Sequence, residues 1–311
     1  MGKGIRIASL LLACIVATAC NRGDDGEAAR KAAEAARKFA AHEKPWRDAR
    51  AAALITPEGW TSVIGLHWID RGAHYAGSAP GNGFRLAKGP AHLGMFTLDA
   101  KNVVTFVPEK GVAVTLDGQP LTGATALRTD QDPAGPAKLG FDDGKGTATI
   151  IVRGDRVALR VKHADAEART HFKGIEYWPG GPEWTVNARF VAHPAGKTLP
   201  IVNIVNMIEE VPNPGAIEFE RDGKLHRLEV LDQGEPTLFL VYADRTSGHG
   251  SYPAGRYLDI PRPGPDGRVR IDFNRGENPP CAFTSFATCP LPPTANRLDL
   301  AVVAGEKVYQ H

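Results

Sequence analysis

Residues 147–161 read TATIIVRGDRVALRV, with two short runs rich in β-branched residues on either side of Gly154 and Asp155. Gly and Asp favour turns, whereas β-branched residues favour strands. Similar runs, bounded by Gly, Pro, Asn or Asp, recur at residues 103–107, 112–116, 184–191, 199–211, 237–242 and 269–273. This spacing predicts an antiparallel all-β protein built from sandwich or barrel-like units.

The composition is that of an ordinary globular protein. Of the 311 residues, 42% are hydrophobic and 23% are charged, so the chain can bury a sizeable core. The 37 Lys and Arg residues nearly balance the 35 Asp and Glu residues, which leaves a formal charge of +2. This balance argues against general nucleic-acid binding, which relies on a strongly positive surface.

Two β units are predicted in the folded part, at residues 46–165 and 166–311. Between residues 163 and 171 the alternating pattern gives way to Ala-Asp-Ala-Glu-Ala, and this break marks the expected boundary. No long helical period interrupts the strands, which argues against a doubly wound nucleotide-binding fold.

Residues 20–45 predict a helical spacer ahead of the β units. The stretch EAARKAAEAARKFAAHEK consists of good helix formers with alternating charge, and Phe39 is its only large apolar residue. A helix that binds a partner protein is the alternative. Pro45 and Trp46 are expected to mark the start of the folded body, because the residue before a proline disfavours helical geometry.

Residues 1–19 are predicted to be a signal peptide. Lys3 and Arg6 precede an apolar run that is too short to span a membrane. The sequence ATAC at residues 17–20 resembles a bacterial lipobox. The resemblance implies a lipoprotein that a diacylated Cys20 anchors to the membrane of the cell envelope.

Alternatives stay open for this N-terminal segment. LLAC at residues 11–14 also matches a lipobox, with Cys14 as the acylated residue. A soluble secreted protein, with Cys20 as a free thiol, is the other possibility. With Cys20 as the anchor, the body faces the periplasm or the cell surface, and Asn21 in the next position favours the outer membrane over the inner.

Cys281 and Cys289 are the only cysteines in the predicted folded part. Because exported proteins readily form disulfides, a structural Cys281–Cys289 disulfide is predicted, and its short loop would contribute about 2–3 kcal/mol. Two cysteines alone supply half a zinc site, and no His pair lies beside them at the spacing of a zinc finger. No metal ion or other cofactor is therefore expected.

Several motifs carry a family resemblance. They include GLHWI at 65–69, DRTSG at 244–248, YPAGRYL at 252–258, DFN at 272–274, NPPCAF at 278–283, CPLPP at 289–293, NRL at 296–298 and AGEK at 304–307. With these motifs the chain resembles the uncharacterised bacterial family named domain of unknown function 1684, from about Trp46 to the C-terminus. The family name carries no activity, so the resemblance implies no reaction.

A polar ligand pocket is predicted in the second β unit. Side chains alternate along the strand expected at residues 269–274, which places Asp272 and Asn274 on one face. The phenol of Tyr252 and the guanidinium of Arg256 would bind polar ligands beside this face. The predicted ligand-binding residues are Tyr252, Arg256, Asp272, Asn274 and Asn278. An ordinary solvent-exposed face and a scaffold of buried ion pairs are the alternatives.

Three functional hypotheses follow. The first is an envelope lipoprotein that binds a small polar or glycan-like ligand without catalysis. The second is an envelope hydrolase that uses a carboxylate such as Asp272 or Glu306, and the third is a structural partner in an envelope complex. Residues 244–250 are expected to form a turn, with a catalytic Asp244–His249 pair as the alternative. The sequence contains neither a G-x-S-x-G elbow nor an H-E-x-x-H zinc motif.

Overall fold

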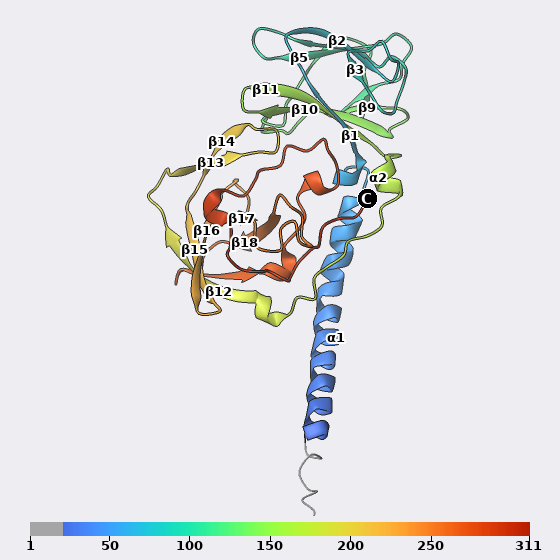
Figure 1. Ribbon diagram of the computed structural model, residues 1–311. Helices are drawn as coiled ribbons and strands as arrows, with labels where there is room; N and C mark the ends of the chain where they lie inside the picture. Colours follow the sequence, from blue (N-terminus) through green and yellow to red (C-terminus); the bar gives the residue numbers. More distant parts are fainter. Residues whose placement is uncertain (1–20) are drawn as a thin grey trace, which may run out of the picture. The chain divides into compact units, whose positions relative to one another are not determined.

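The computed structural model of the protein describes residues 21–311, so the predicted signal peptide and Cys20 lie outside the described residues. The chain divides into two units, with the boundary between Trp46 and Arg47. One long helix, α1 (Asn21–Leu54), crosses this boundary (Figure 1). Within residues 21–311, no helix is both long and apolar enough to cross a membrane.

The helix α1 confirms the predicted N-terminal helix but extends past its expected end. Pro45 lies inside the helix, where a proline removes a backbone hydrogen bond at a cost of about 3 kcal/mol. Beyond the proline, Leu54 is buried, and Nε of Arg50 donates to Oε1 of Glu306 at 2.9 Å. These tertiary contacts keep the last turns helical, and the prediction that the helix ends at Pro45 is wrong.

Residues 63–163 form two sheets (Figure 1). One has the strand order β1-β11-β10-β9-β6-β7 and the other the order β3-β2-β4-β5-β8. The strands are β1 (Val63–Trp68), β2 (Gly72–Gly77), β3 (Phe84–Arg85), β4 (Gly94–Leu98), β5 (Val104–Pro108), β6 (Thr115–Leu116), β7 (Gln119–Pro120), β8 (Thr125–Leu127), β9 (Leu139–Phe141), β10 (Gly146–Arg153) and β11 (Arg156–His163). Strand pairing is antiparallel apart from the parallel pair β2–β3.

The remaining strands form a sheet with the order β16-β15-β12-β19 and two separate hairpins, β13–β14 and β17–β18. These strands are β12 (Thr185–Ala192), β13 (Thr198–Val202), β14 (Ile208–Pro212), β15 (Gly215–Arg221), β16 (Lys224–Val230), β17 (Thr237–Tyr242), β18 (Arg256–Pro261) and β19 (Arg268–Asp272). Short helical segments lie between strands: η1 (Trp60–Ser62), α2 (Glu167–Thr170), η2 (Pro182–Trp184), η3 (Phe273–Arg275), η4 (Pro280–Ala282) and η5 (Thr294–Asn296). The predicted all-β antiparallel class is confirmed.

Each group of strands has its own hydrophobic cluster. Phe96, Phe106 and Leu159 belong to the cluster of the first two sheets. Leu240 and Ile271 belong to the cluster of the strands that follow. Burial of these side chains is the main favourable contribution to folding.

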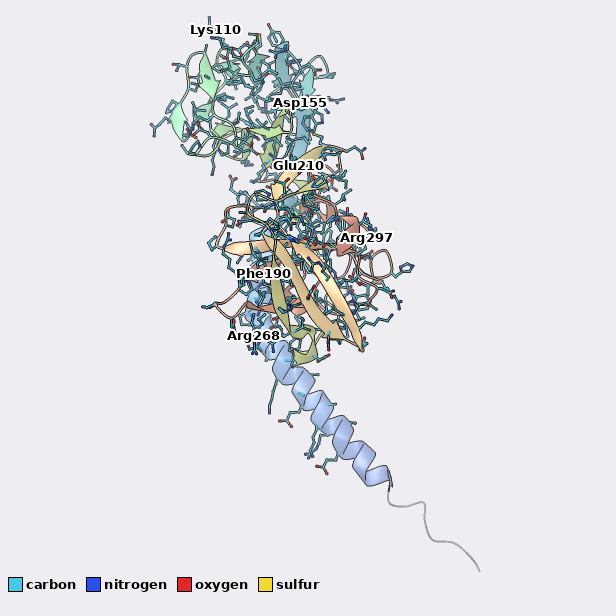
Figure 2. All side chains as sticks on the ribbon, turned by 90° about the vertical axis from the view of Figure 1, so that its left-hand side faces the viewer. Lys110, Asp155, Phe190, Glu210, Arg268 and Arg297 are labelled. Carbon is cyan, nitrogen blue, oxygen red and sulfur yellow. The ribbon has the colours of Figure 1, made fainter. Side chains whose placement is uncertain are left out.

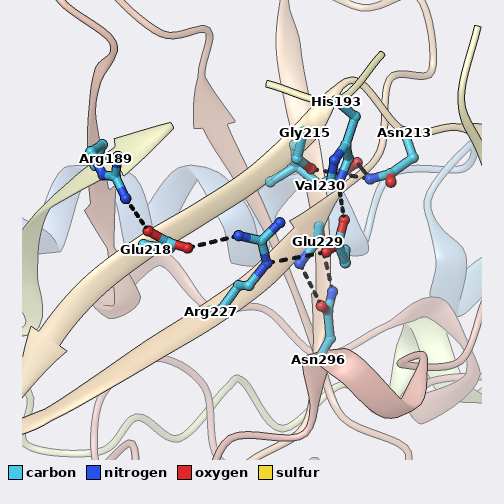
Figure 3. Close-up of polar contacts among 9 residues, drawn as sticks. All are labelled: Arg189, His193, Asn213, Gly215, Glu218, Arg227, Glu229, Val230 and Asn296. Atoms are coloured by element: carbon cyan, nitrogen blue, oxygen red, sulfur yellow. Dashed lines mark hydrogen bonds and ion pairs between the residues drawn. The ribbon is translucent and has the colours of Figure 1, made fainter. Parts of the chain in front are cut away.

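A polar network joins β16 to η5. Oδ1 of Asn296 accepts a hydrogen bond from the Glu229 amide at 2.7 Å, and Nδ2 of Asn296 donates to the Glu229 carbonyl at 2.8 Å (Figure 3). The Glu229 carboxylate pairs with Nε2 of His193 at 2.6 Å. Because His193 follows β12, the network holds three separate parts of the chain together.

The turn between β10 and β11 contacts the hairpin β13–β14. A Cβ atom placed on Gly154 in this turn would lie 2.9 Å from Cε of Met207, which lies between the two strands of that hairpin. Asp155 marks the turn in Figure 2. Nε of Arg153 also donates to Oγ1 of Thr288 at 3.1 Å. The first group of strands therefore meets the second at this junction.

Candidate functional site

A pocket of about 420 Å³ lies at this junction. Trp60, Arg153 and Arg160 line it from one side. Residues of β13, β14, β17 and β18 line it from the other, together with parts of the segment 280–290. A pocket of this volume is large enough for a small organic ligand.

Arg160 of β11 supplies a cation that no carboxylate of the described residues neutralises. Among residues 21–311, its guanidinium makes no hydrogen bond or ion pair, and its Nε atom is buried. The guanidinium carbon lies 5.2 Å from the ring centroid of Trp60. Burial, followed by repulsion from Arg153, lowers the pKa of Arg160 to about 10. The group is therefore still charged at neutral pH.

The other charged groups of the pocket differ from Arg160. Nη1 of Arg153 lies 2.6 Å from Oδ2 of Asp130, so the charge of Arg153 is largely neutralised. Glu209 of β14 also lines the pocket and brings one negative charge. Arg160 remains the cation that lacks a carboxylate from the described chain.

Asn203, which follows β13, presents a second unsatisfied donor. The side chain is 4% exposed, and its Oδ1 accepts hydrogen bonds from the amides of Val205 and Met207 at 3.1 and 3.0 Å. Nδ2 is buried and has no hydrogen-bond partner within residues 21–311. An unpaired buried donor costs about 1–3 kcal/mol, which an acceptor on a ligand would offset.

Aromatic side chains form the apolar wall. The rings of Phe239 and Tyr257 pack edge to face, with centroids 4.9 Å apart and an interplanar angle of 79°. The Tyr257 hydroxyl donates to the Pro290 carbonyl at 2.9 Å. Because that hydroxyl is occupied, Tyr257 contributes mainly its ring to the pocket.

A second cavity, of about 190 Å³, shares Trp60, Phe239 and Tyr257 with the pocket. Glu277 lines it, and Oε2 of Glu277 lies 3.1 Å from Nη1 of Arg50. Burial raises the pKa of Glu277 to about 7, although the charge of Arg50 opposes this rise. The cavity therefore contains a carboxyl group that titrates near neutral pH.

Asn278 lines this second cavity, and its backbone amide is hydrogen-bonded to the buried carboxylate of Glu306. Glu306 is fully buried, and its two oxygens accept from Nε of Arg50 at 2.9 Å and from the Asn278 amide at 2.6 Å. Nδ2 of Asn278 donates to the Lys307 carbonyl at 2.6 Å. Asn278 lines the cavity, whereas Glu306 has both oxygens engaged, which argues against its use as a catalytic acid.

The predicted ligand residue Arg256 is completely buried. Its Nη2 donates to Oδ2 of Asp244 at 2.7 Å and to the Val302 carbonyl at 2.9 Å, and its Nη1 donates to the Ala304 carbonyl. These contacts favour the scaffold alternative. The structure brings Asp244 to Arg256, whereas His249 is exposed and contacts the Ser247 carbonyl at 3.3 Å. The Asp244–His249 pair is therefore not formed.

The predicted residues Asp272, Asn274 and Tyr252 also bind protein groups. Oδ1 of Asp272 accepts from the Asn274 amide at 3.1 Å and caps η3. The Asn274 side chain accepts from the Gly181 amide at 3.0 Å and donates to its carbonyl at 2.9 Å. The Tyr252 hydroxyl donates to the Cys281 carbonyl at 3.0 Å. Asn274 lies in η3 rather than in β19, so the predicted row of side chains along one strand face is not continuous.

Cys281 and Cys289 are free thiols in the structure, so the predicted disulfide is not formed. They are nevertheless neighbours, because the Cys281 amide donates to Sγ of Cys289 at 3.1 Å. The sulfur of Cys289 is thus used as a hydrogen-bond acceptor. Within residues 21–311, no group of three or more His, Cys, Asp or Glu side chains is placed to hold a metal ion.

Residues 170–307 match the model of a family described as Protein of unknown function (DUF1684). The chain belongs to the DUF1684 family. This match covers less of the chain than the predicted resemblance, which began near Trp46. The DUF1684 region holds Asn203, Phe239, Tyr257 and Cys289 of the pocket, whereas Arg160 lies outside it.

A solved structure shows similarity to part of this DUF1684 protein. The solution NMR structure of an uncharacterized protein from Haloarcula marismortui is 30% identical, and the match covers 45% of this chain and 78% of that one, with a TM-score of 0.38. A comparison with curated proteins found no match.

Arg160, Asn203 and Trp60 were not predicted as site residues from the sequence. Arg160 occupies an ordinary polar position in the strand sequence RVALRVKH, and Asn203 lies within a run that was predicted to be one strand. Trp60 and Arg160 meet only through the fold. An arginine between apolar neighbours in a strand was the available signal, but strand faces often carry such residues.

Proposed function

We propose that this DUF1684 protein binds a small organic acid in the pocket between its two groups of strands. The observation that carries the proposal is the half-buried guanidinium of Arg160, which has no hydrogen bond or ion pair within residues 21–311. A half-buried charge without an ion-pair partner loses part of its hydration, and an anionic ligand would offset that cost. This proposal narrows the predicted small polar ligand to an anion.

The lining favours one negative charge on an apolar body. Arg153 is already paired with Asp130, and Glu209 would repel a ligand with several negative charges. The rings of Phe239 and Tyr257 offer an apolar surface on which a hydrocarbon or aromatic body packs. A monocarboxylate therefore matches the pocket better than a phosphate ester or an uncharged glycan.

The proposal places this binding protein at the bacterial cell envelope, anchored through lipid on Cys20. The long helix α1, which follows that cysteine, supports it. At a rise of about 1.5 Å per residue, a helix of this length extends for about 50 Å. Its exposed surface carries the ion pairs Glu27–Lys31 and Glu34–Lys38, both at 2.8 Å, as expected for a solvated spacer.

Labelling with a radioactive fatty acid tests the anchor. We expect the label on the wild-type protein and its loss in Cys20→Ala. Label that survives this substitution, or that never attaches to the wild type, overturns the lipoprotein assignment.

Thermal unfolding of the full chain tests ligand binding. The probes are octanoate and benzoate, with octanamide as the neutral analogue and N-acetylglucosamine as a glycan. A ligand at about 100 times its Kd stabilises the fold by about 2.7 kcal/mol, which is visible as a rise in Tm. We expect the rise with the acids and not with octanamide. A rise only with the sugar, or equal rises with octanoate and octanamide, would contradict the proposal.

A second candidate, a hydrolase, is favoured by one observation. Glu277 lines the second cavity with a pKa raised to about 7 by burial, and a group that titrates near neutral pH suits general acid–base catalysis. Turnover of nitrophenyl esters that disappears in Glu277→Gln would establish this function. The absence of turnover by a protein that binds octanoate would exclude esterase activity toward these substrates.

A further inference from the structure

The two cysteines of the second group of strands form a connected thiol pair. The Cys281 amide donates to Sγ of Cys289 at 3.1 Å, which keeps the two cysteines in direct contact. A tyrosine hydroxyl lies beside each sulfur, that of Tyr252 near Cys281 and that of Tyr257 near Cys289. The two sulfurs are thus held next to each other as free thiols.

The two thiols differ in access. Cys281 is partly exposed and lines a separate pocket of about 700 Å³, together with apolar residues that include Val63, Phe283 and Phe286. Cys289 is 3% exposed. A reagent can reach Cys281 through the 700 Å³ pocket, whereas Cys289 is buried and lines the pocket of about 420 Å³.

The thiols also differ in acidity. The hydrogen bond from the Cys289 thiol lowers the pKa of Cys281, and the nearby Tyr252 hydroxyl acts in the same direction. Donation of that hydrogen bond, together with burial, raises the pKa of Cys289. Because the thiolate is the nucleophile in thiol chemistry, Cys281 is the better attacking group and Cys289 the better resolving group.

We infer that Cys281 and Cys289 form a thiol–disulfide exchange site that reduces low-molecular-weight disulfides entering the 700 Å³ pocket. The Cys281 thiolate attacks one sulfur of the substrate, which forms a mixed disulfide and releases the first substrate thiolate. Cys289 then loses its proton and attacks Sγ of Cys281, which releases the second thiolate and leaves a Cys281–Cys289 bond. The substrate disulfide is reduced to two thiols, which take up the two protons lost by the cysteines.

This reaction differs from the permanent structural bond that the sequence predicted. A structural disulfide would resist reduction in the folded protein, whereas the disulfide of an exchange site is returned to the dithiol by an added dithiol reductant, which is itself oxidised to a disulfide. The attacking residue Cys281 lines the 700 Å³ pocket, whereas Cys289 also lines the proposed acid-binding pocket. Octanoate binding and thiol exchange are measured by separate experiments, and the exchange step requires no bound acid. Either proposal can therefore fail alone.

Reaction with dithiobis(nitrobenzoate), an aromatic disulfide whose released thiolate is coloured, tests the inference. The full chain carries Cys14→Ser and Cys20→Ser in every sample, so that Cys281 and Cys289 are the remaining thiols, and it is first reduced with dithiothreitol under native conditions. We expect about two equivalents of coloured thiolate per chain, and an intact mass that shows an internal disulfide rather than bound reagent. Cys289→Ser should release about one equivalent and retain one reagent moiety, and Cys281→Ser should react at least about tenfold more slowly.

Three results would overturn the inference. They are a native protein whose thiols dithiothreitol does not regenerate, a product that carries two bound reagent moieties, and a Cys281→Ser variant that reacts at the wild-type rate. Circular dichroism confirms that each variant is folded, and Cys281→Ala and Cys289→Ala replace any serine variant that is not. Tyr252→Phe separates acidity from access, because it should move the half-maximal rate to higher pH while the yield of coloured thiolate stays unchanged.

Discussion

The guanidinium carbon of Arg160 lies 5.2 Å from the ring centroid of Trp60. A cation that stacks on an aromatic ring is held in place without being neutralised. Arg153 is held differently, because its charge is paired with Asp130 at 2.6 Å. The stacked arginine therefore keeps its charge for a ligand, and this difference between two neighbouring arginines is the basis of the proposed function.

Asn203→Asp tests the second donor of the pocket. The substitution keeps an oxygen that accepts from the Val205 and Met207 amides but replaces the unpartnered Nδ2 with a negative oxygen. We expect the Kd for octanoate to rise by about 10–100-fold, because loss of one donor and added repulsion cost about 1.4–3 kcal/mol. Asn206→Asp, in the exposed turn nearby, is the matched control. Equal effects of the two substitutions on Kd would remove Asn203 from the site.

Glu277 is expected to make the folded protein less stable as the pH rises. Its carboxyl has a pKa near 4.5 when unfolded and about 7 when folded, so unfolding is relatively easier at high pH. The contribution of Glu277 to the free energy of unfolding is fully present below about pH 4.5 and is lost as the pH rises through 7. Arg50, Glu306 and Asp259 are the charged groups that act on it.

Glu277→Gln is therefore expected to change the shape of the stability profile. Between pH 4.5 and 7 the free energy of unfolding of the wild type should fall relative to that of the variant, by about 1–2 kcal/mol after allowance for the partial exposure of the carboxyl. Urea unfolding of both proteins at several pH values measures this difference. A constant difference across this range would show that Glu277 titrates normally.

The buried Arg256–Asp244 pair is expected to stabilise the fold rather than to bind ligand. Both side chains are inaccessible to solvent, so Arg256→Leu leaves an unpaired buried carboxylate and should cost about 3–5 kcal/mol of unfolding free energy. Arg262→Leu removes the exposed pair with Asp232 and should cost less than about 1 kcal/mol. Urea unfolding compares the two variants. A stable Arg256→Leu protein that fails to bind octanoate would instead restore Arg256 as a ligand residue.

Local sequence pattern predicted the strands well and their connections less well. The strand expected at residues 237–242 is β17 (Thr237–Tyr242), and Val269 and Ile271 of β19 are buried as alternation requires. The run 199–211 proved to be the hairpin β13–β14, because Asn203 accepts two amide hydrogen bonds and turns the chain. Hydrophobic periodicity does not predict a turn that depends on side-chain hydrogen bonds. The end of the helix was predicted wrongly at Pro45 for a similar reason, because the residues that stabilise the helix beyond Pro45 are distant in the sequence.

The candidate site could not be predicted from the sequence, because its parts come from distant segments. Trp60 and Arg160 meet Phe239 and Cys289 only after the two groups of strands associate. Polar residues close together in sequence, such as Asp272 and Asn274, bind neighbouring backbone groups instead. Selecting polar residues that lie close together in the sequence therefore found groups that hold the backbone. The residues that line the pocket come together only through tertiary contacts. The resemblance to the DUF1684 family was confirmed, since its motifs are local in sequence.

The proposed binding of an organic acid by Arg160 is tested by the Kd of octanoate for the full chain, measured by calorimetry for the wild type and two variants. Arg160→Gln removes the guanidinium that has no ion pair within residues 21–311. Arg156→Gln is the matched control, because Arg156 also belongs to β11 and stacks on a tryptophan, with its guanidinium carbon 4.0 Å from the Trp68 ring centroid. We predict that Kd rises at least about tenfold for Arg160→Gln, equivalent to about 1.4 kcal/mol, and stays unchanged for Arg156→Gln. A wild type that binds no octanoate, or an Arg160→Gln variant that binds it equally well, would contradict acid binding by Arg160.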